Sequence, residues 1–170
     1  MQKKRDGRAV SVRKVRRGDS NSVFRLWEDI ADERKFVVTE HVSPERKQRW
    51  ISSINDSGVL WVLAEVDGRL AGTLTLSRYG NLEKTKHLRD LEIGVAKPFR
   101  GIGVGTALMG YAIKWAGKNR VKKVILSVFS TNKKALALYK KFGFVHEGTR
   151  KGQYLIDGEY VDEVVMGTFV

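Results

Sequence analysis

Apolar residues along this chain follow two spacings, and the change from one to the other marks the expected elements. Short apolar runs and strict apolar–polar alternation are typical of β-strands. Asp67-Gly68 separates two such segments and predicts a hairpin turn, and Asp157-Gly158 separates the last two. Strands are therefore predicted at residues 10–15, 59–66, 69–79, 87–95, 123–129, 144–149 and 160–169.

The remaining apolar residues recur every three or four positions, which is typical of helices with one buried face. Ser43-Pro44 has a capping residue followed by proline, the usual start of a helix. Four helices are expected: from Asp19 or Ser20 to about Arg34, from Ser43 with Trp50, Ile51 and Ile54 inward, from Val104 to about Gly117, and from the Ser130-Thr131-Asn132 cap through Phe142. The four tryptophans fall on apolar stripes, so they are expected in the core.

The predicted order is strand, two helices, three strands, helix, strand, helix and two strands. This order is typical of a mixed α/β domain with a largely antiparallel first half and a βαβ unit in the second. At 170 residues the chain has the length of one domain. We expect a basic, flexible tail at residues 1–9 and a single domain at residues 10–170.

The net charge of +13 is unevenly placed, because residues 1–17 hold eight Lys or Arg and one Asp. Such a segment either contacts RNA or another acidic surface, or is a solvated tail. No apolar run reaches the roughly 20 residues that cross a bilayer, so a cytoplasmic protein without a membrane contact is expected. Cysteine is absent, which excludes disulfides and thiolate chemistry, and three scattered histidines do not suggest a metal site.

A glycine-rich loop follows the apolar run at residues 91–95. Gly101, Gly103 and Gly105 are each separated by one residue, and a helical pattern begins directly after them. Glycines at the start of a helix expose backbone N–H groups to an anion, and the helix dipole favours negative charge there. Arg100 can add a guanidinium at the same place. A phosphate or pyrophosphate ligand is therefore predicted.

Two common glycine loops fit this segment poorly. A dinucleotide-binding loop needs Gly-x-Gly-x-x-Gly and an acidic residue about 20 positions later, whereas the region around Lys122 and Lys123 is basic. A P-loop needs Gly-Lys-Ser/Thr, but Gly105 is followed by Thr106 without a lysine.

Arg100-x-x-Gly103-x-Gly105 resembles the Gln/Arg-x-x-Gly-x-Gly/Ala signature of the GCN5-related N-acetyltransferases. The predicted element order is similar to that family's fold from about residue 10 to residue 170. The segment 148–166 resembles the C-terminal hairpin of the subgroup acting on amino acids and small amines. Five downstream residues also match the family pattern N-x-x-A-x-x-x-Y-x-x-x-G-F: Asn132, Ala135, Tyr139, Gly143 and Phe144.

The resemblance implies a central mixed, mostly antiparallel sheet, splayed between its fourth and fifth strands and flanked by about four helices. It implies acetyl-CoA as cosubstrate and no metal, with the pantetheine arm lying in the splay. Gly94, inside a strand, is then a β-bulge or a site of close approach. The implied cofactor-binding residues are Ile93, Gly94, Val95, Arg100, Gly101, Ile102, Gly103, Val104, Gly105, Thr106, Asn132, Ala135 and Tyr139.

Acetyl transfer to an amine requires a base for the ammonium, a donor for the thioester oxyanion and an acid for the leaving thiolate. Asp90 and Glu92 lie two residues apart and face one side of a regular strand, with Glu92 the first choice as base and Asp90 the second. A backbone N–H near Val95 is expected to serve the oxyanion. By the resemblance, Tyr139 is the proton donor to the thiolate.

Acceptor contacts in the family come from residues 36–41 and 150–160 here. These segments hold side chains that could bind a cationic amine: Glu40, Tyr154, Asp157, Glu159 and Tyr160. The first hypothesis is an N-acetyltransferase acting on a small amine or amino acid, as a monomer or homodimer. Two alternatives stay open: acetylation of a protein N-terminus or lysine, and a non-catalytic module binding acetyl-CoA or nucleic acid.

Overall fold

The computed structural model describes residues 2–3, 9–35 and 42–170. The described strands form one eight-stranded sheet in the order β1-β2-β3-β4-β5-β6-β8-β7, in which only β5 and β6 are parallel. The predicted mixed, mostly antiparallel sheet is thereby confirmed. The strands are β1 (Gln2–Lys3), β2 (Ala9–Lys14), β3 (Leu60–Val66), β4 (Arg69–Arg78), β5 (Leu88–Val95), β6 (Lys123–Phe129), β7 (Val145–Ile156) and β8 (Glu159–Phe169).

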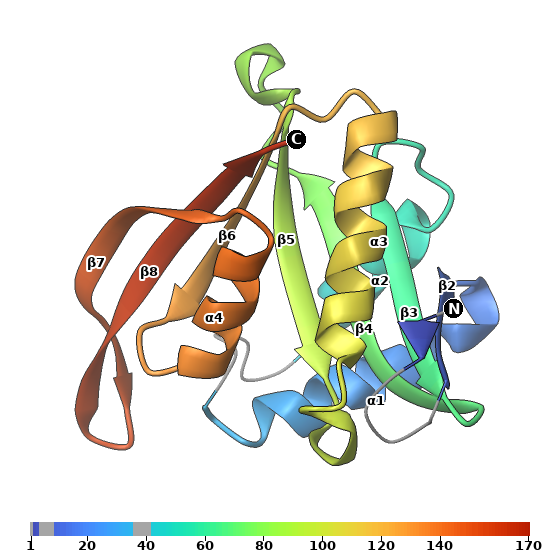
Figure 1. The fold of residues 1–170 in the computed structure, drawn as a ribbon, viewed down its shortest axis with the longest axis horizontal. Coiled ribbons are helices and arrows are strands. Elements are labelled where there is room, and N and C mark those ends of the chain that lie inside the picture. The colour runs from blue at the N-terminus through green and yellow to red at the C-terminus, as the bar shows by residue number, and fades with distance from the viewer. Residues whose placement is uncertain (1, 4–8, 36–41) are drawn as a thin grey trace.

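Helices cover both faces of this sheet. In Figure 1, α3 and α4 lie in front of the sheet and α1 and α2 lie behind it. Ser43 caps α2 by accepting a hydrogen bond from the Arg46 N–H at 3.3 Å, with Pro44 in the first helical position. The helices are α1 (Ser20–Ala31), α2 (Pro44–Ser53), α3 (Val104–Lys118) and α4 (Lys133–Lys141), with short 3₁₀ turns at Arg17–Asp19, Glu83–Thr85 and Lys97–Phe99.

Some predicted boundaries were wrong, each for a local reason. Helix α1 ends at Ala31, three residues before Arg34, while α3 continues past Gly117, and the chain takes a left-handed conformation only at Arg120. Strand β7 runs on to Ile156 because two register shifts let it stay paired with β8. Both Asp-Gly turns are present, with positive φ at each of their residues.

Two apolar clusters form the core, one on each face of the sheet. The larger one packs α3 and Tyr139 of α4 against β3, β4, β5 and β6. The smaller one joins α1 and α2 to the sheet around Phe24, Trp27 and Trp61. The Trp61 indole N–H donates to the Thr73 hydroxyl at 3.0 Å, so this buried donor is satisfied.

The two parallel strands separate partway along their length. Strands β5 and β6 pair only at Leu88–Lys123, Arg89–Val124 and Asp90–Ile125. Beyond Asp90 the two strands diverge, so the predicted splay between the fourth and fifth strands of the main sheet is present. The splay creates an opening through the sheet, between the front and rear helices.

Two predicted segments lie wholly or partly outside the described residues. The acceptor segment at residues 36–41, including Glu40, is one of them. In the basic N-terminal segment, Gln2–Lys3 pairs with β2 as an antiparallel strand, and residues 1 and 4–8 are outside the described part.

Candidate active site

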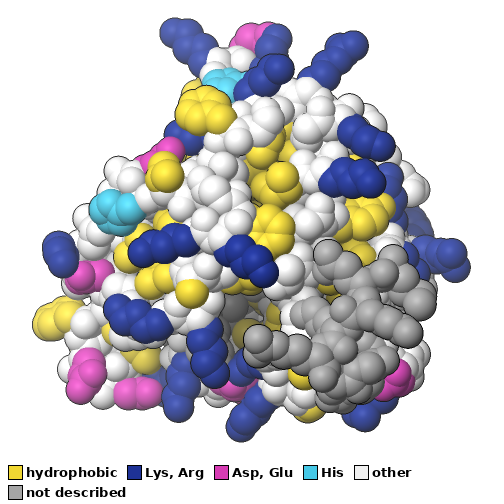
Figure 2. All heavy atoms as spheres, in the orientation of Figure 1, with side chains coloured by type: hydrophobic (Ala, Val, Ile, Leu, Met, Phe, Trp, Pro, Cys, Tyr) yellow, Lys and Arg dark blue, Asp and Glu magenta, His cyan; other side chains and the backbone are white. Residues whose placement is uncertain are grey.

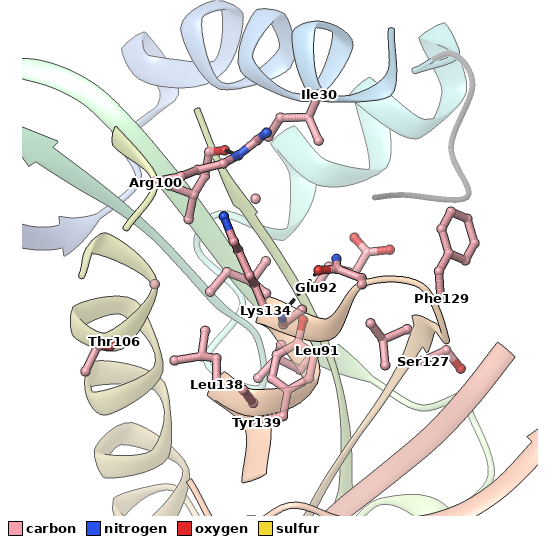
Figure 3. Close-up of a pocket in the computed structure, with 18 of the residues that line it drawn as sticks. Ile30, Leu91, Glu92, Arg100, Thr106, Ser127, Phe129, Lys134, Leu138 and Tyr139 are labelled. Atoms are coloured by element: carbon pink, nitrogen blue, oxygen red, sulfur yellow. Dashed lines mark hydrogen bonds between the residues drawn. The ribbon is translucent and has the colours of Figure 1, made fainter. Parts of the chain in front are cut away.

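A pocket of about 720 Å³ occupies the opening between β5 and β6. In the close-up, Arg100 and Thr106 lie on one side of it and Ser127 and Phe129 of β6 on the other, with Tyr139 of α4 between them (Figure 3). Of the predicted site residues, Ile102 and Val104 do not line it, because their side chains pack in the core. The predicted residues that do line it are Asp90, Glu92, Ile93, Gly94, Val95, Arg100, Gly101, Gly103, Gly105, Thr106, Asn132, Ala135, Tyr139 and the acceptor candidate Tyr154, whereas the acceptor candidates Asp157, Glu159 and Tyr160 do not line it.

Strand β5 presents different chemistry to the two sides of the sheet. Leu91, Ile93 and Val95 belong to or pack against the core on the α3 side. Because side chains alternate along a strand, Asp90, Glu92 and Gly94 face α1 and α2. The carboxylates of Asp90 and Glu92 therefore border the opening on the α1–α2 side of the sheet, and apolar side chains of β5 border it on the α3 side.

Gly94 brings α1 close to the strand. A Cβ at this position would lie 2.8 Å from Ile30 Cδ1 and 3.3 Å from Trp27 Cζ3. The register from Gly72–Val95 to Arg78–Arg89 contains no shift, so the predicted β-bulge is absent and the alternative prediction of close approach is correct. Trp27, expected only in the core, is both buried and part of the pocket wall.

The edge of β5 beyond Asp90 turns backbone groups toward the opening. The Ala96 N–H donates to the Ala71 carbonyl at 2.9 Å and so points toward β4. Hydrogen-bonding direction alternates along an antiparallel strand, so the Val95 N–H points the other way, into the splay. This is the place where the sequence predicts an oxyanion donor.

The glycine loop ends at the start of α3, where the sequence predicts an anion site. Gly101 and Gly103 have φ of 79° and 85°, and Gly103 is the N-cap of α3. Gly105 serves another purpose, since a Cβ there would lie 3.0 Å from Leu138 Cδ2 and push α3 away from α4. The N–H groups of the first helical turn have no intrahelical acceptor and carry the positive end of the helix dipole.

The Arg100 side chain is engaged by protein groups, and its predicted role at an anion site stays a prediction. Its Nη1 and Nη2 donate to the two Glu33 carboxylate oxygens at 2.8 and 2.6 Å, and its Nε donates to the Val95 carbonyl at 2.9 Å. The bidentate carboxylate satisfies the guanidinium and neutralises its charge. Arg100 therefore ties the segment after α1 to the end of β5. The hydrogen bonds from Arg100 also hold the pKa of Glu33 below its ordinary value.

Other cations leave the α3–α4 side of the molecule positive. Residues 97–141 contain eleven Lys or Arg and no Asp or Glu. Figure 2 shows Lys and Arg side chains spread over the face that α3 and α4 cover. Lys134, at the start of α4, lines the pocket and points toward Arg100 (Figure 3). An anionic ligand at the start of α3 would therefore meet a positive surface.

The two candidate bases have different surroundings. Glu92 forms an ion pair with Arg46 of α2, with Oε1 and Nη2 2.8 Å apart. Asp90 has no ion-pair partner within residues 9–35 and 42–170. Burial raises the pKa of Asp90 to about 6, and the negative charges of Glu92 and Glu163 add to this effect. Asp90 is thus ionised at neutral pH and a stronger base than an ordinary aspartate.

Tyr139 and Asn132 project from α4 at the opposite wall. Burial raises the pKa of the Tyr139 phenol, so it stays protonated at neutral pH, and its ring lies 5.9 Å from that of Phe144. Asn132 caps α4, because its Oδ1 accepts a hydrogen bond from the Ala135 N–H at 3.2 Å. Both residues line the pocket, and the roles that the motif implies for them stay predictions.

Several pocket residues were missed from the sequence. Glu163 of β8 is 5% exposed, and it accepts hydrogen bonds from Tyr154 at 2.9 Å and from Arg150. Burial alone would raise the pKa of Glu163, but the hydrogen bonds from Tyr154, Arg150 and Ser127 outweigh it and lower that pKa. Glu163 lies two residues after the apolar Val161, so both side chains are on the same face of the strand. This spacing was a signal available in the sequence. Nothing comparable marked Arg46, which lies on a polar helix.

In the described part of the chain, no group of three or more His, Asp or Glu side chains is arranged to hold a metal ion. None of the described helices has the length and apolar character that a bilayer span requires.

Solved structures share this fold. An acetyltransferase from Streptococcus pneumoniae matches with a TM-score of 0.87 and 23% identity, covering 95% of this chain and 100% of its own. A phosphinothricin acetyltransferase from Sinorhizobium meliloti, solved in complex with acetyl-CoA, matches with a TM-score of 0.84 and 20% identity, covering 95% and 88% of the two chains.

Sequence comparison agrees with the structural one. An L-amino acid N-acetyltransferase of Escherichia coli is 36% identical over 154 residues, which are 89% of this chain and 94% of the relative. A putative phosphinothricin acetyltransferase of Bacillus subtilis is 25% identical over 159 residues, or 93% and 98% of the two chains. The model of the acetyltransferase (GNAT) family matches residues 23–144. With this match and the 36% identity to a relative of nearly equal length, the chain belongs to the acetyltransferase (GNAT) family.

Proposed function

We propose that this acetyltransferase moves the acetyl group of acetyl-CoA directly to the primary amine of a small molecule. The observation that carries the proposal is the opening between β5 and β6, which ends at the start of α3 and holds Asp90 on one wall and Tyr139 on the other. The names of the relatives, an L-amino acid and a phosphinothricin acetyltransferase, support an acceptor of small size.

The residues present fit acetyl-CoA. The backbone N–H groups from Arg100 to Thr106 would hold its pyrophosphate, and Lys134 would add a positive charge. Strand edge at Ile93 and Val95 would pair with the amides of the pantetheine arm. When bound, acetyl-CoA supplies the acetyl group as a thioester. The Val95 N–H would donate to the thioester oxygen and stabilise negative charge there.

Proton transfer is assigned to two side chains. Asp90 accepts the proton of the acceptor ammonium, directly or through a water molecule, because its pKa of about 6 is the one raised toward neutrality. Glu92, the first choice from sequence, is held in an ion pair by Arg46, and its charge adds to the raised pKa of Asp90. Tyr139 donates its phenolic proton toward the departing sulfur. Asn132 keeps the start of α4, and with it Tyr139, in place.

Release of free CoA from acetyl-CoA across a panel of amines and amino acids tests the proposal. We expect steady-state turnover with at least one small amine, and a turnover reduced by about 10²-fold or more in Tyr139→Phe with little change in acetyl-CoA affinity. Tight acetyl-CoA binding without turnover on any amine would instead identify a non-catalytic binding module.

A further inference from the structure

The acceptor end of the pocket is rich in carboxylates. Asp90, Glu92 and Glu163 all line it, from two different strands. Arg46 is the cation that lines the pocket at this end, and it is already paired with Glu92 at 2.8 Å. The other lining cations lie toward the glycine loop, where Arg100 is bound by Glu33 and Lys134 points toward Arg100 (Figure 3).

The carboxylate of Glu163 also has a cationic partner. Arg150 pairs with Glu163, which additionally accepts the Tyr154 hydroxyl at 2.9 Å. Asp90 has no such cation among the described residues, so one negative charge is left over. Residues 36–41, whose placement is not described, contain no Lys or Arg in the sequence. Their composition therefore offers no lysine or arginine to offset the excess carboxylate.

An α-amino acid would place its own carboxylate among these acids. Its carboxylate sits on the carbon that bears the amine, and the amine must reach Asp90 to lose a proton. Like charges within about 4–6 Å disfavour one another when partly buried. Burial is the main cause of the raised pKa of Asp90, and the charges of Glu92 and Glu163 raise it further, so these two carboxylates already disfavour a further negative charge beside Asp90. Trp27, Ile30 and Phe129 provide apolar wall instead.

We infer that the acceptor is an amine without a free carboxylate beside it, recognised by the excess acid at Asp90 and by the apolar wall. This inference rests on the proposed acetyl transfer and narrows its acceptor. Three sources share this chemistry: a monoamine, an amino acid amide and the N-terminal residue of a peptide. The carboxylate of a free amino acid is the group that the pocket disfavours.

Matched acceptors test the inference directly. The probes are L-phenylalanine, L-phenylalanine amide, phenethylamine and an amidated dipeptide beginning with phenylalanine, each with acetyl-CoA and the full chain. Phenethylamine is a stronger base than phenylalanine, so any advantage it shows does not come from a larger neutral fraction. L-Methionine and its amide are compared in the same way. A preference that appears with both amino acids comes from the carboxylate and not from the side chain of the acceptor.

Because the amides and the peptide are weaker bases than the free amino acids, kcat/KM is calculated on the concentration of neutral amine. We expect this kcat/KM for at least one carboxylate-free acceptor to exceed that for phenylalanine by about tenfold or more, which is about 1.4 kcal/mol. Glu163→Gln removes one carboxylate and releases Arg150. It should therefore lower the ratio of kcat/KM for the carboxylate-free acceptor to kcat/KM for phenylalanine. Glu147→Gln is the matched control, because Glu147 pairs with Lys123 outside the pocket and the ratio should stay unchanged.

Two results would overturn the inference, and they are distinguishable. Turnover of phenylalanine equal to or faster than that of its amide and of phenethylamine would leave acetyl transfer intact and reject the acceptor class. A complete lack of CoA release with every probe would reject the proposed function and the inference together.

Discussion

Asp90 and Glu92 share one face of β5, and their neighbours give them different roles. Arg46 neutralises Glu92, whereas Asp90 is left as a buried acid with a pKa near 6. Asp90→Asn should therefore lower kcat/KM by about 10²-fold to 10⁴-fold, and Glu92→Gln by much less. The acid limb of the wild-type kcat/KM profile, where activity rises with pH through about 6, should disappear in Asp90→Asn. A larger loss in Glu92→Gln would return the base to Glu92.

Keeping Asp90 ionised should also cost stability. Its pKa is higher in the folded state, about 6, than the ordinary 3.8, so the folded chain binds this proton more tightly than the unfolded chain. The contribution of Asp90 to the free energy of unfolding is most favourable below pH 4 and is lost as the pH rises through 6. Asp90→Asn should thus raise the free energy of unfolding by about 2–3 kcal/mol at pH 8 and by much less at pH 4. Urea unfolding at the two pH values measures the difference, and an equal effect at both would contradict this linkage.

At the scale of elements, the pocket depends on how closely α1 approaches β5. Gly94→Ala would bring a methyl group within 2.8 Å of Ile30 Cδ1, so α1 must move or the strand must yield. We expect a loss of about 1–3 kcal/mol in unfolding free energy together with reduced turnover. Gly110→Ala is the control: it lies inside α3 with nothing within 4 Å of its Cβ position, and should stabilise the chain by about 0.5–1 kcal/mol. Equal effects of the two changes would reject this role for Gly94.

The Glu33–Arg100 pair joins the segment after α1 to the cofactor side of the site. If Arg100 ties these elements together, Glu33→Gln and Arg100→Gln should each weaken acetyl-CoA binding by a similar factor of about ten. The double variant should bind acetyl-CoA no more weakly than either single variant. Calorimetry of acetyl-CoA binding measures this. If Arg100 instead contacts phosphate, freeing it in Glu33→Gln would leave binding unchanged or tighter.

A matched control for this pair is available elsewhere. Asp56 and Arg78 form a comparable two-bond pair outside the pocket. Asp56→Asn should lower stability to a similar extent as Glu33→Gln without changing the dissociation constant of acetyl-CoA. A loss of affinity in this control would mean that general destabilisation, and not the tie at the glycine loop, explains the other variants.

Across the whole molecule, the sequence predicted most features that depend on neighbouring residues, apart from the ends of α1, α3 and β7. The Asp67-Gly68 hairpin, the Asn132 cap and the position of β6 follow from local patterns, and each agrees with the structure. Long-range partners could not be read in this way. Glu33 meets Arg100 across 67 positions, and Glu163 reaches the pocket because β8 inserts between β6 and β7. Neither of these long-range contacts leaves a periodic pattern in the sequence.

The central claim is that donor and acceptor meet through the opening between β5 and β6, from opposite faces of the sheet. A crystal structure of the full chain with acetyl-CoA tests it most directly. We predict that the pantetheine arm lies between the two strands, with the thioester oxygen within hydrogen-bonding distance of the Val95 N–H and the thioester carbon open toward Asp90. A pantetheine arm lying outside this opening, or a thioester turned away from Asp90, would contradict the claim.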